Sequence, residues 1–301
     1  MRICKPGRVR DRLWYLGHEE SGIYLLEGTD ESIVISGGMS YICPAVMGQL
    51  EEFGIDKARI KKLLILHAHF DHIGVVPFFQ RHQTGLEIYG SARAWEILRM
   101  PKAIHTINEF SRSVADRMGM REACLEYDLD WRMDIGGTAL SEGDILELGD
   151  FNVEILETPG HSSCSITAYV PQIKALFPSD GGGVPYKDMI ITSGNSNYTA
   201  FQRSLEKLEG LDVDYLCADH YGYVTGDEAG NYISCAIAQA REHRAKIEEV
   251  YSQTKDIDAT VKELTGSMYA ENPDYFLSPE ILEGVYRQMV RHIVAATGET
   301  R

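Results

Sequence analysis

Leu63-Leu-Ile-Leu-His-Ala-His-Phe-Asp-His-Ile-Gly74 joins a short apolar run to three histidines and an aspartate within six residues. An apolar run rich in Leu and Ile that closes in a polar cluster is typical of a buried strand that ends at a site. Imidazole and carboxylate groups are the usual ligands of Zn, Fe and Mn, and sites that split water keep a position open for it. We therefore interpret His67, His69, Asp71 and His72 as metal ligands at a strand end.

Further candidate ligands lie along the rest of the chain, each just past an apolar, strand-like run: His161, Asp180 and His220. Five of the ten histidines fall in the combined set, which favours one shared site over a chance surface cluster. Seven ligands are too many for one tetrahedral ion, but they suit two ions bridged by a carboxylate and a water. Asp180 is the natural bridge.

On both sides of the opening stretch, short β-branched and aromatic runs predict strands, and apolar residues at i, i+3 and i+4 predict helices. The predicted strands are residues 14–16, 23–26, 32–36, 61–66, 86–89, 145–148, 151–156, 165–170, 174–177 and 213–218. The predicted helices are residues 44–53, 91–100, 101–120 and 198–208, with another beginning near residue 73. Strands that carry ligands at their ends, with helices between them, predict two stacked sheets with helices outside.

Two segments stand apart from this pattern. Residues 101–121 are longer than a normal connection, so they form either a lid or binding segment or a plain packing helix. From about Asp227 the apolar spacing predicts a helical appendage, which divides the chain into a main domain of residues 1–226 and an appendage of residues 227–301 packed on it. The aromatic residues of this tail, Tyr275 and Phe276 among them, are interpreted as core or as the roof of an apolar pocket.

Composition and charge bear on which partners the chain is expected to have. The 301 residues are 44% hydrophobic and 25% charged, as in ordinary globular proteins, and the net charge of −16 disfavours nucleic acid as a partner. We see no apolar run of signal-peptide or membrane-span length, so we expect a cytoplasmic protein without a membrane partner. The six scattered cysteines contain no C-x-x-C pair and are interpreted as reduced thiols.

The ordered set His67-x-His69-x-Asp71-His72, Gly160-His161, Asp180 and His220 resembles the metallo-β-lactamase superfamily over about residues 10–225. The resemblance implies an α+β fold, an αβ/βα four-layer sandwich with the helical appendage at its C-terminus. It also implies two metal-binding sets, with Asp180 as the bridge. The implied first set is His67, His69 and His161, and the implied second set is Asp71, His72 and His220.

Details of the motifs refine this resemblance. Asp180 stands where true metallo-β-lactamases often carry Cys, which is similar to the glyoxalase II, lactonase and thioesterase side of the family, and the tail resembles that of PqsE-like proteins. Three places depart from the family pattern: an Asp is missing from Val34-Ile-Ser-Gly37, Ser179 replaces the usual Gly before Asp180, and Asp219 replaces the usual Gly before His220. Asp219 is either a hydrogen-bond partner of a ligand imidazole or an exposed turn residue.

The resemblance implies a dinuclear hydrolase that attacks an ester, thioester or lactone with a metal-bound hydroxide, because a metal lowers the pKa of bound water from ~15.7 toward ~7. Asp71 and Asp180 are the implied catalytic carboxylates. The cofactors are two divalent ions, and Zn, Fe and Mn all suit N/O ligands. The alternatives are a phosphodiesterase of the same superfamily and a regulatory protein whose metal is largely structural.

Substrate contacts are harder to place. Tyr186, Tyr221, Tyr223 and His105 are candidates for a substrate pocket, with wall or surface residues as the alternative interpretation. The remaining histidines, His243 among them, are interpreted as structural or surface residues. The expected partner is a small-molecule or acyl substrate, and a homodimer is left open.

Overall fold

The computed structural model describes residues 1–275 and 277–297. By their contacts these residues form two compact units. Unit 1 contains Met1–Glu157, Cys164–Ser179 and Asp212–Gly230. Unit 2 contains Thr158–Ser163, Asp180–Leu211 and the chain from Asn231 onward.

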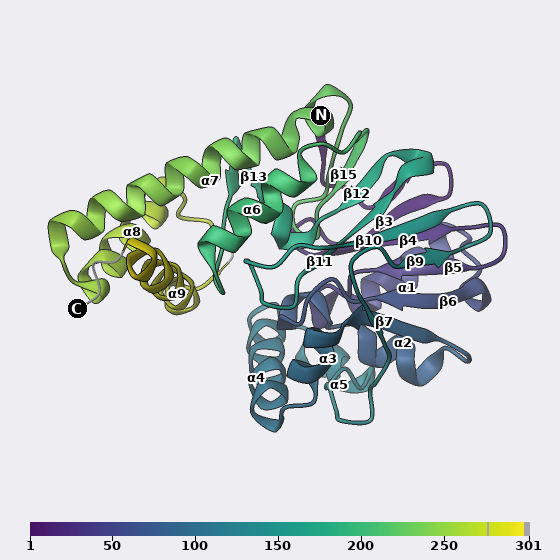
Figure 1. The fold of residues 1–301 in the computed structure, drawn as a ribbon. Helices are drawn as coiled ribbons and strands as arrows, with labels where there is room; N and C mark the ends of the chain where they lie inside the picture. Colours follow the sequence, from purple (N-terminus) through teal and green to yellow (C-terminus); the bar gives the residue numbers. More distant parts are fainter. Residues whose placement is uncertain (276, 298–301) are drawn as a thin grey trace. The chain divides into compact units, whose positions relative to one another are not determined.

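Unit 1 holds two seven-stranded sheets (Figure 1). The first has the order β2-β3-β4-β5-β6-β7-β8, antiparallel from β2 to β5 and parallel from β5 to β8. Its strands are β2 (Gly7–Arg10), β3 (Leu13–Gly17), β4 (Gly22–Glu27), β5 (Ser32–Ile35), β6 (Ile60–Leu64), β7 (Glu87–Ser91) and β8 (Thr138–Leu140). The parallel strands place the end of β6, where the histidine cluster begins, beside the end of β5.

The second sheet has the order β1-β16-β15-β12-β11-β10-β9, and its one parallel pair among the described residues is β12 with β15. Its strands are β1 (Arg2–Ile3), β9 (Ile145–Glu147), β10 (Asn152–Glu157), β11 (Ile166–Val170), β12 (Ala175–Phe177), β15 (Tyr215–Cys217) and β16 (Tyr223–Thr225). The parallel pair makes β12 and β15 end on the same side, so the residues that follow them, Ser179 and Asp219, are brought together.

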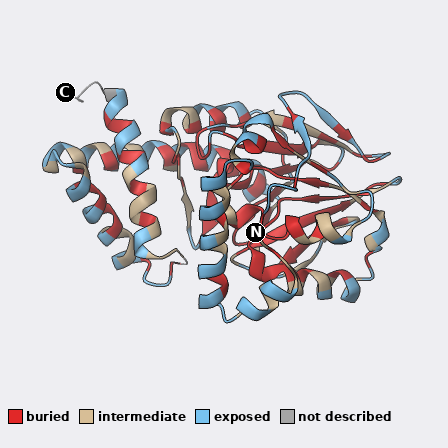
Figure 2. Ribbon diagram, turned by 90° about the horizontal axis from the view of Figure 1, so that it is seen from below, coloured by how far each residue is buried: buried red, intermediate tan, exposed pale blue. Residues whose placement is uncertain are grey.

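The core of unit 1 lies between the two sheets. Leu26, Ile33 and Leu64 of the first sheet form one apolar cluster with Ile155 and Phe177 of the second, and all of these side chains are fully buried. Burial of apolar side chains at a sheet interface is the main stabilising contribution in such a sandwich. Figure 2 shows the central strands of the sheets largely in the colour of buried residues.

Helices of unit 1 occupy the connections within the first half of the chain. They are α1 (Cys43–Glu52), α2 (Val76–His82), α3 (Ala92–Leu98), α4 (Pro101–Arg117) and α5 (Arg121–Glu126), with short 3-10 turns that include η1 (Ser40–Ile42) and η3 (Phe70–His72). Helix α4 buries Ile107 and Val114 and ends before Gly119, whose φ is +68°. This positive φ explains why the predicted helix through residue 120 stops early and a separate α5 follows.

Unit 2 is mainly helical. It contains the ribbon of β13 (Val184–Tyr186) and β14 (Met189–Ile191), helix α6 (Tyr198–Leu208), most of α7 (Asp227–Thr254), α8 (Ile257–Glu271) and α9 (Pro279–Thr297). The Tyr198 side chain is buried, and its hydroxyl contacts the carbonyl oxygen of Ala240 at 3.1 Å. Tyr232 donates to the carbonyl oxygen of Gly183 at 3.0 Å. These contacts join α6 and the 183–192 segment to α7.

The predicted mixed α/β fold with two stacked sheets is confirmed, as are the ten predicted strands and the helices of residues 44–53, 91–100 and 198–208, with small shifts at their ends. Strands β1, β2, β8, β13, β14 and β16, each two to four residues long, were not predicted. The boundary between residues 226 and 227 stays a prediction, and Phe276 and residues 298–301 lie outside the described residues. Among the described helices, none combines the length and apolar character needed to cross a bilayer. The cytoplasmic location stays a prediction.

Candidate metal centre

The histidine cluster begins where β6 ends. Leu63, Leu64, Ile65 and Leu66 are all fully buried, so the chain arrives at His67 from the core. The backbone N–H of Ile65 donates to the carbonyl oxygen of Tyr89 in β7 at 2.8 Å. The apolar run is therefore anchored within its sheet up to the first candidate ligand.

Glycines allow the cluster to pack closely on the end of β5. The N–H of Gly37 donates to the carbonyl oxygen of His72 at 2.8 Å, and that of Gly74 donates to Gly38 at 2.7 Å. A Cβ atom at Gly74 would lie 2.1 Å from the backbone nitrogen of Ser40, and one at Gly37 would lie 2.7 Å from the oxygen of His72. Both glycines are required by this close approach of two backbones.

Asp71, His72 and His220 form a buried group in unit 1 with the geometry of metal ligands. The Nε2 atoms of His72 and His220 lie 3.2 Å apart. Oδ2 of Asp71 lies 3.7 Å from Nε2 of His72 and 3.6 Å from Nε2 of His220. These residues are far apart in sequence, and the parallel end of β15 brings His220 to the η3 turn.

The tautomers of the two imidazoles follow from their other contacts. Nδ1 of His220 lies 2.7 Å from the carbonyl oxygen of Glu20, and Nδ1 of His72 lies 2.7 Å from Oδ2 of Asp219. Both partners accept hydrogen bonds, so each neutral ring carries its hydrogen on Nδ1 and a lone pair on Nε2. Two such lone pairs and a carboxylate oxygen converge and repel one another, and a cation among them removes this repulsion. The group therefore fits a divalent metal.

His67 and His69 make a second convergence in unit 1. Nε2 of His67 and Nδ1 of His69 lie 3.1 Å apart, and the rings are nearly perpendicular. Nδ1 of His67 lies 3.2 Å from the hydroxyl oxygen of Ser179. His67 is fully buried and His69 is half-buried. The pair presents two ring nitrogens in the arrangement expected for two ligands of one ion.

His161 and Asp180 are neighbours in unit 2. Nε2 of His161 lies 3.4 Å from Oδ2 of Asp180, and Nδ1 of His161 donates to the carbonyl oxygen of Ser193 at 2.8 Å. The turn before His161 depends on Gly160, whose φ is +135°, because a Cβ atom there would lie 2.1 Å from the backbone nitrogen of Phe201. Here too a lone pair on Nε2 faces a carboxylate oxygen.

Asp219 and Ser179 complete the environment of these ligands. Both side chains are buried, with 2% of each residue exposed. The alternative that Asp219 is an exposed turn residue is wrong, because its carboxylate accepts from His72 inside unit 1. Ser179, whose hydroxyl lies beside His67, was not singled out from the sequence. Its signal was its place directly before Asp180, where a Gly was expected.

The four predicted pocket residues lie in different surroundings. Tyr186 is buried in unit 2 with its ring 5.3 Å from that of Tyr275. Tyr223 is buried in the core between the sheets, and Tyr221 has a φ of +59° and donates its N–H to Glu19. His105 lies on α4 with 71% of its side chain exposed, 3.2 Å from Glu109. Their role in a substrate pocket stays a prediction.

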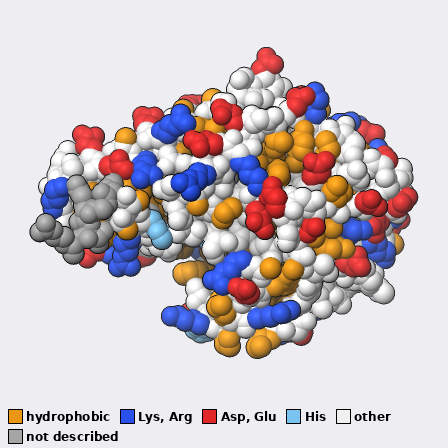
Figure 3. Space-filling model, viewed as in Figure 1, with side chains coloured by type: hydrophobic (Ala, Val, Ile, Leu, Met, Phe, Trp, Pro, Cys, Tyr) orange, Lys and Arg blue, Asp and Glu red, His pale blue; other side chains and the backbone are white. Residues whose placement is uncertain are grey.

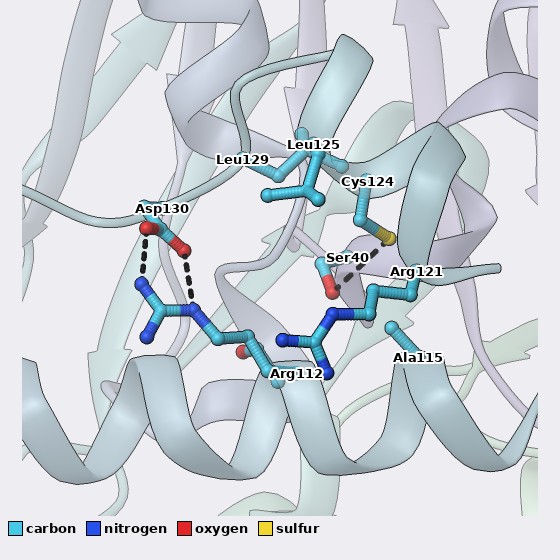
Figure 4. A pocket seen from close by; sticks show the side chains of 9 residues that line it. Ser40, Arg112, Ala115, Arg121, Cys124, Leu125, Leu129 and Asp130 are labelled. Carbon is cyan, nitrogen blue, oxygen red and sulfur yellow. Dashed lines mark hydrogen bonds and ion pairs between the residues drawn. The ribbon is translucent and has the colours of Figure 1, made fainter.

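Unit 1 also has a cavity of about 160 Å³ between α4, α5, η1 and the loop before Trp131 (Figure 4). Two arginines line it, but Arg112 is paired with Asp130, and Arg121 lies 2.6 Å from a carboxylate oxygen of Asp116. None of the predicted ligands lines this cavity. Because both guanidinium charges are already balanced, the cavity does not resemble an anion site.

A family model described as the metallo-beta-lactamase superfamily matches residues 19–220, which is more than half of the chain. The chain belongs to the metallo-β-lactamase superfamily, as its motifs predicted.

Individual relatives agree with this placement. The chain is 27% identical over 247 residues to acyl-coenzyme A thioesterase MBLAC2 of Gallus gallus, a match that covers 76% of this chain and 83% of the relative. It is 30% identical over 182 residues to hydroxyacylglutathione hydrolase GloC of Haemophilus influenzae, with 59% of this chain and 74% of the relative covered. A crystal structure of a metallo-beta-lactamase family protein from Thermus thermophilus superimposes with a TM-score of 0.70 at 18% identity, covering 97% of this chain and 95% of that one.

Together these results confirm the predicted fold and the predicted class of enzyme. The solved structure establishes the fold, and the family model and the hydrolase relatives establish a metal-dependent hydrolase of this superfamily. The buried His and Asp groups supply ligands that suit a divalent metal.

Proposed function

We propose that the chain is a dinuclear hydrolase that cleaves acyl thioesters. The observation that carries the metal-dependent part is the convergence of Asp71, His72 and His220, whose facing atoms are all hydrogen-bond acceptors. The thioester part rests on the relatives, since acyl-coenzyme A and acylated glutathione are both acyl groups carried on a thiol. Esters and lactones are the neighbouring substrate classes.

In this proposal the two ligand sets are those implied by the motif order. Asp71, His72 and His220 would hold one ion, and His67 and His69 would hold the other with His161. Asp180 would bridge the ions. We infer the contributions of His161 and Asp180 from the motifs and from the donor chemistry of their own pair in unit 2.

Two divalent ions at these positions would supply hydroxide at neutral pH and would polarise the substrate carbonyl. The residues of the chain then have separate tasks. The Nδ1 contacts of His72 and His220 hold the rings in place with Nε2 directed at the centre. The Asp71 carboxylate would orient the attacking water and accept its proton.

Charge supports a small acyl substrate over a polyanion. The chain carries a net charge of −16, and in the face shown in Figure 3 basic side chains are interspersed with acidic ones. A nuclease needs a local excess of basic residues to hold its phosphates. The charge distribution therefore does not favour the phosphodiesterase alternative. Faster hydrolysis of a phosphodiester than of a thioester would favour that alternative over our proposal.

The proposal is tested with purified protein supplied with Zn²⁺, Mn²⁺ or Fe²⁺ and given S-acyl glutathione, acyl-coenzyme A, an aryl ester and bis(p-nitrophenyl) phosphate. We expect metal-dependent release of the thiol from the first two substrates. His72→Ala should abolish this release, whereas Ser32→Ala, which removes a buried hydroxyl on β5, should retain it. Metal binding without hydrolysis of any substrate would support the regulatory alternative instead.

A further inference from the structure

Two buried residues outside the candidate ligand sets, Ser179 and Asp219, lie between the candidate ligands of unit 1. The hydroxyl of Ser179 donates to Oδ2 of Asp219. The same carboxylate oxygen lies 2.7 Å from Nδ1 of His72, and the same hydroxyl lies 3.2 Å from Nδ1 of His67. A single pair of side chains therefore contacts an imidazole in each of the two convergences.

The directions of these hydrogen bonds are determined by the groups involved. The Asp219 carboxylate can only accept, so it takes hydrogens from both Ser179 and His72. Because the one hydrogen of the Ser179 hydroxyl is donated to Asp219, this hydroxyl can only accept a hydrogen bond from Nδ1 of His67. The chain of donation runs from His67 through Ser179 to Asp219, with His72 joining at the same oxygen. Both imidazoles thus carry their hydrogen on Nδ1 and direct Nε2 away from this pair.

Backbone geometry shows that this arrangement has a cost. Ser179 has a φ of +49°, a conformation that residues other than Gly adopt at some expense in energy. The second carboxylate oxygen of Asp219, Oδ1, is buried without a hydrogen-bond partner among the described residues. A glycine at position 179 would avoid the first cost, and a glycine at position 219 would avoid the second. Two neighbouring side chains that carry such costs are expected to have a role.

We propose that Ser179 and Asp219 are a coupled pair of positioning residues. They fix the tautomer and ring orientation of His67 and His72 together, so that the two ligand sets are aligned as one unit. The inference rests on the proposed metal centre, but it does not depend on the substrate. Hydrogen-bond partners of ligand imidazoles commonly change metal affinity by 10- to 100-fold.

A double-mutant cycle in metal binding tests the coupling. The affinity of the full-length chain for Co²⁺ is measured by competition with a chelator, and the visible spectrum of bound Co²⁺ reports the ligand geometry. We expect Ser179→Ala and Asp219→Ala each to weaken binding about 10- to 100-fold and to alter the spectrum. The double variant should be no weaker than Asp219→Ala, because without the carboxylate the hydroxyl is no longer held.

Controls separate this result from a general loss of structure. Asp219→Asn keeps one acceptor oxygen and the shape of the side chain, so it should recover part of the affinity lost in Asp219→Ala. Ser32→Ala removes another buried serine hydroxyl and should bind as the wild type does. Should the Asp219 variants fail to fold, Ser179→Ala and its spectrum decide the matter alone.

The inference is overturned if the loss of Co²⁺ affinity in the double variant equals the product of the losses in the two single variants. It is also overturned if the single variants bind Co²⁺ within about twofold of the wild type. A wild-type chain that binds no Co²⁺, Zn²⁺, Mn²⁺ or Fe²⁺ would instead overturn the proposed metal centre itself. The two failures are therefore distinguishable.

Discussion

Nδ1 of His72 in unit 1 and Nδ1 of His243 in unit 2 each contact an oxygen acceptor, but the two rings have different surroundings. Nδ1 of His72 donates to Asp219, and Nδ1 of His243 lies 3.0 Å from the carbonyl oxygen of Thr192. The other side of the His72 ring faces His220 and Asp71, whereas the ring of His243 lies edge-on to two tyrosines, Tyr198 and Tyr286. What the second nitrogen faces, rather than an anchored Nδ1, distinguishes a ligand from a structural histidine.

The largest difference in hydrolysis and metal binding should appear between two single substitutions, one at His72 and one at His243. His72→Ala removes a ligand atom, so we expect metal-dependent hydrolysis to fall by more than about 100-fold, beyond the usual effect of losing a ligand's hydrogen-bond partner. His243→Asn keeps a donor toward Thr192 and should leave metal binding unchanged. Chelator competition and initial rates measure both. Equal losses in the two variants would contradict the distinction.

The turn that carries His161 gives the next effect. Gly160→Ala should destabilise the chain by at least about 3 kcal/mol, because it combines a positive φ with a clash against the backbone of Phe201. Gly210→Ala is the matched control in the same unit, since a Cβ there meets nothing within 4 Å. Urea unfolding curves compare the two. A Gly160 variant as stable as the Gly210 variant would show that this turn is loosely packed.

His243 predicts a pH dependence of the stability of the folded chain. Burial among apolar neighbours lowers the pKa of His243 to about 4. The unfolded chain, with a pKa near 6.5, therefore binds this proton more readily than the folded chain does. Stability is then full above about pH 6.5 and is lost as the pH falls toward 4, by at most about 3 kcal/mol. The half-buried position of the residue makes this an upper limit.

The difference between the wild type and His243→Asn isolates this contribution. Unfolding free energies are measured from pH 7 to pH 4, and the wild type should lose more stability than the variant over that range. Parallel curves for the two proteins would show that His243 is already protonated in the folded chain or is exposed to water.

The smallest effects concern two helix caps, one in each unit. Ser91 caps α3 by accepting from the N–H of Ala94 and also donates to the carbonyl oxygen of Cys164, whereas exposed Asn197 caps α6 by accepting from Ala200. Asn197→Ala should cost about 1 kcal/mol and Ser91→Ala about 2 kcal/mol, because the latter leaves a buried carbonyl without its donor. Thermal unfolding ranks the two variants. The reverse order would mean that Cys164 finds another donor.

Groups of residues that are close together in the sequence were the easiest to predict. His67, His69, Asp71 and His72 lie within one turn, so their residue types and spacing were sufficient to predict a metal-binding group. The strands before them were equally predictable from local apolar patterns. Some very short strands, such as β1 and β8, were not, since few of their residues carry the pattern, although the three-residue strands β9, β12 and β15 were predicted.

The motif order did predict that distant His220 joins Asp71 and His72, but other contacts between distant segments were not revealed by the sequence. The hydrogen bond of Ser179 to Asp219 joins residues 40 positions apart and depends on the parallel pairing of β12 with β15. Residues 158–163 and 180–211 join the helical tail in unit 2, although they precede it by many residues. Neither relation has a local pattern, because both arise from how the sheets are connected.

The metal content of the chain tests the central claim most directly. Elemental analysis of freshly purified protein, after saturation with one divalent metal and removal of the excess, gives the number of ions bound per chain. We predict two ions for the wild type and for His243→Asn, and fewer for His72→Ala. A wild-type chain without metal, or a His72→Ala variant with the full wild-type content, would contradict the assignment.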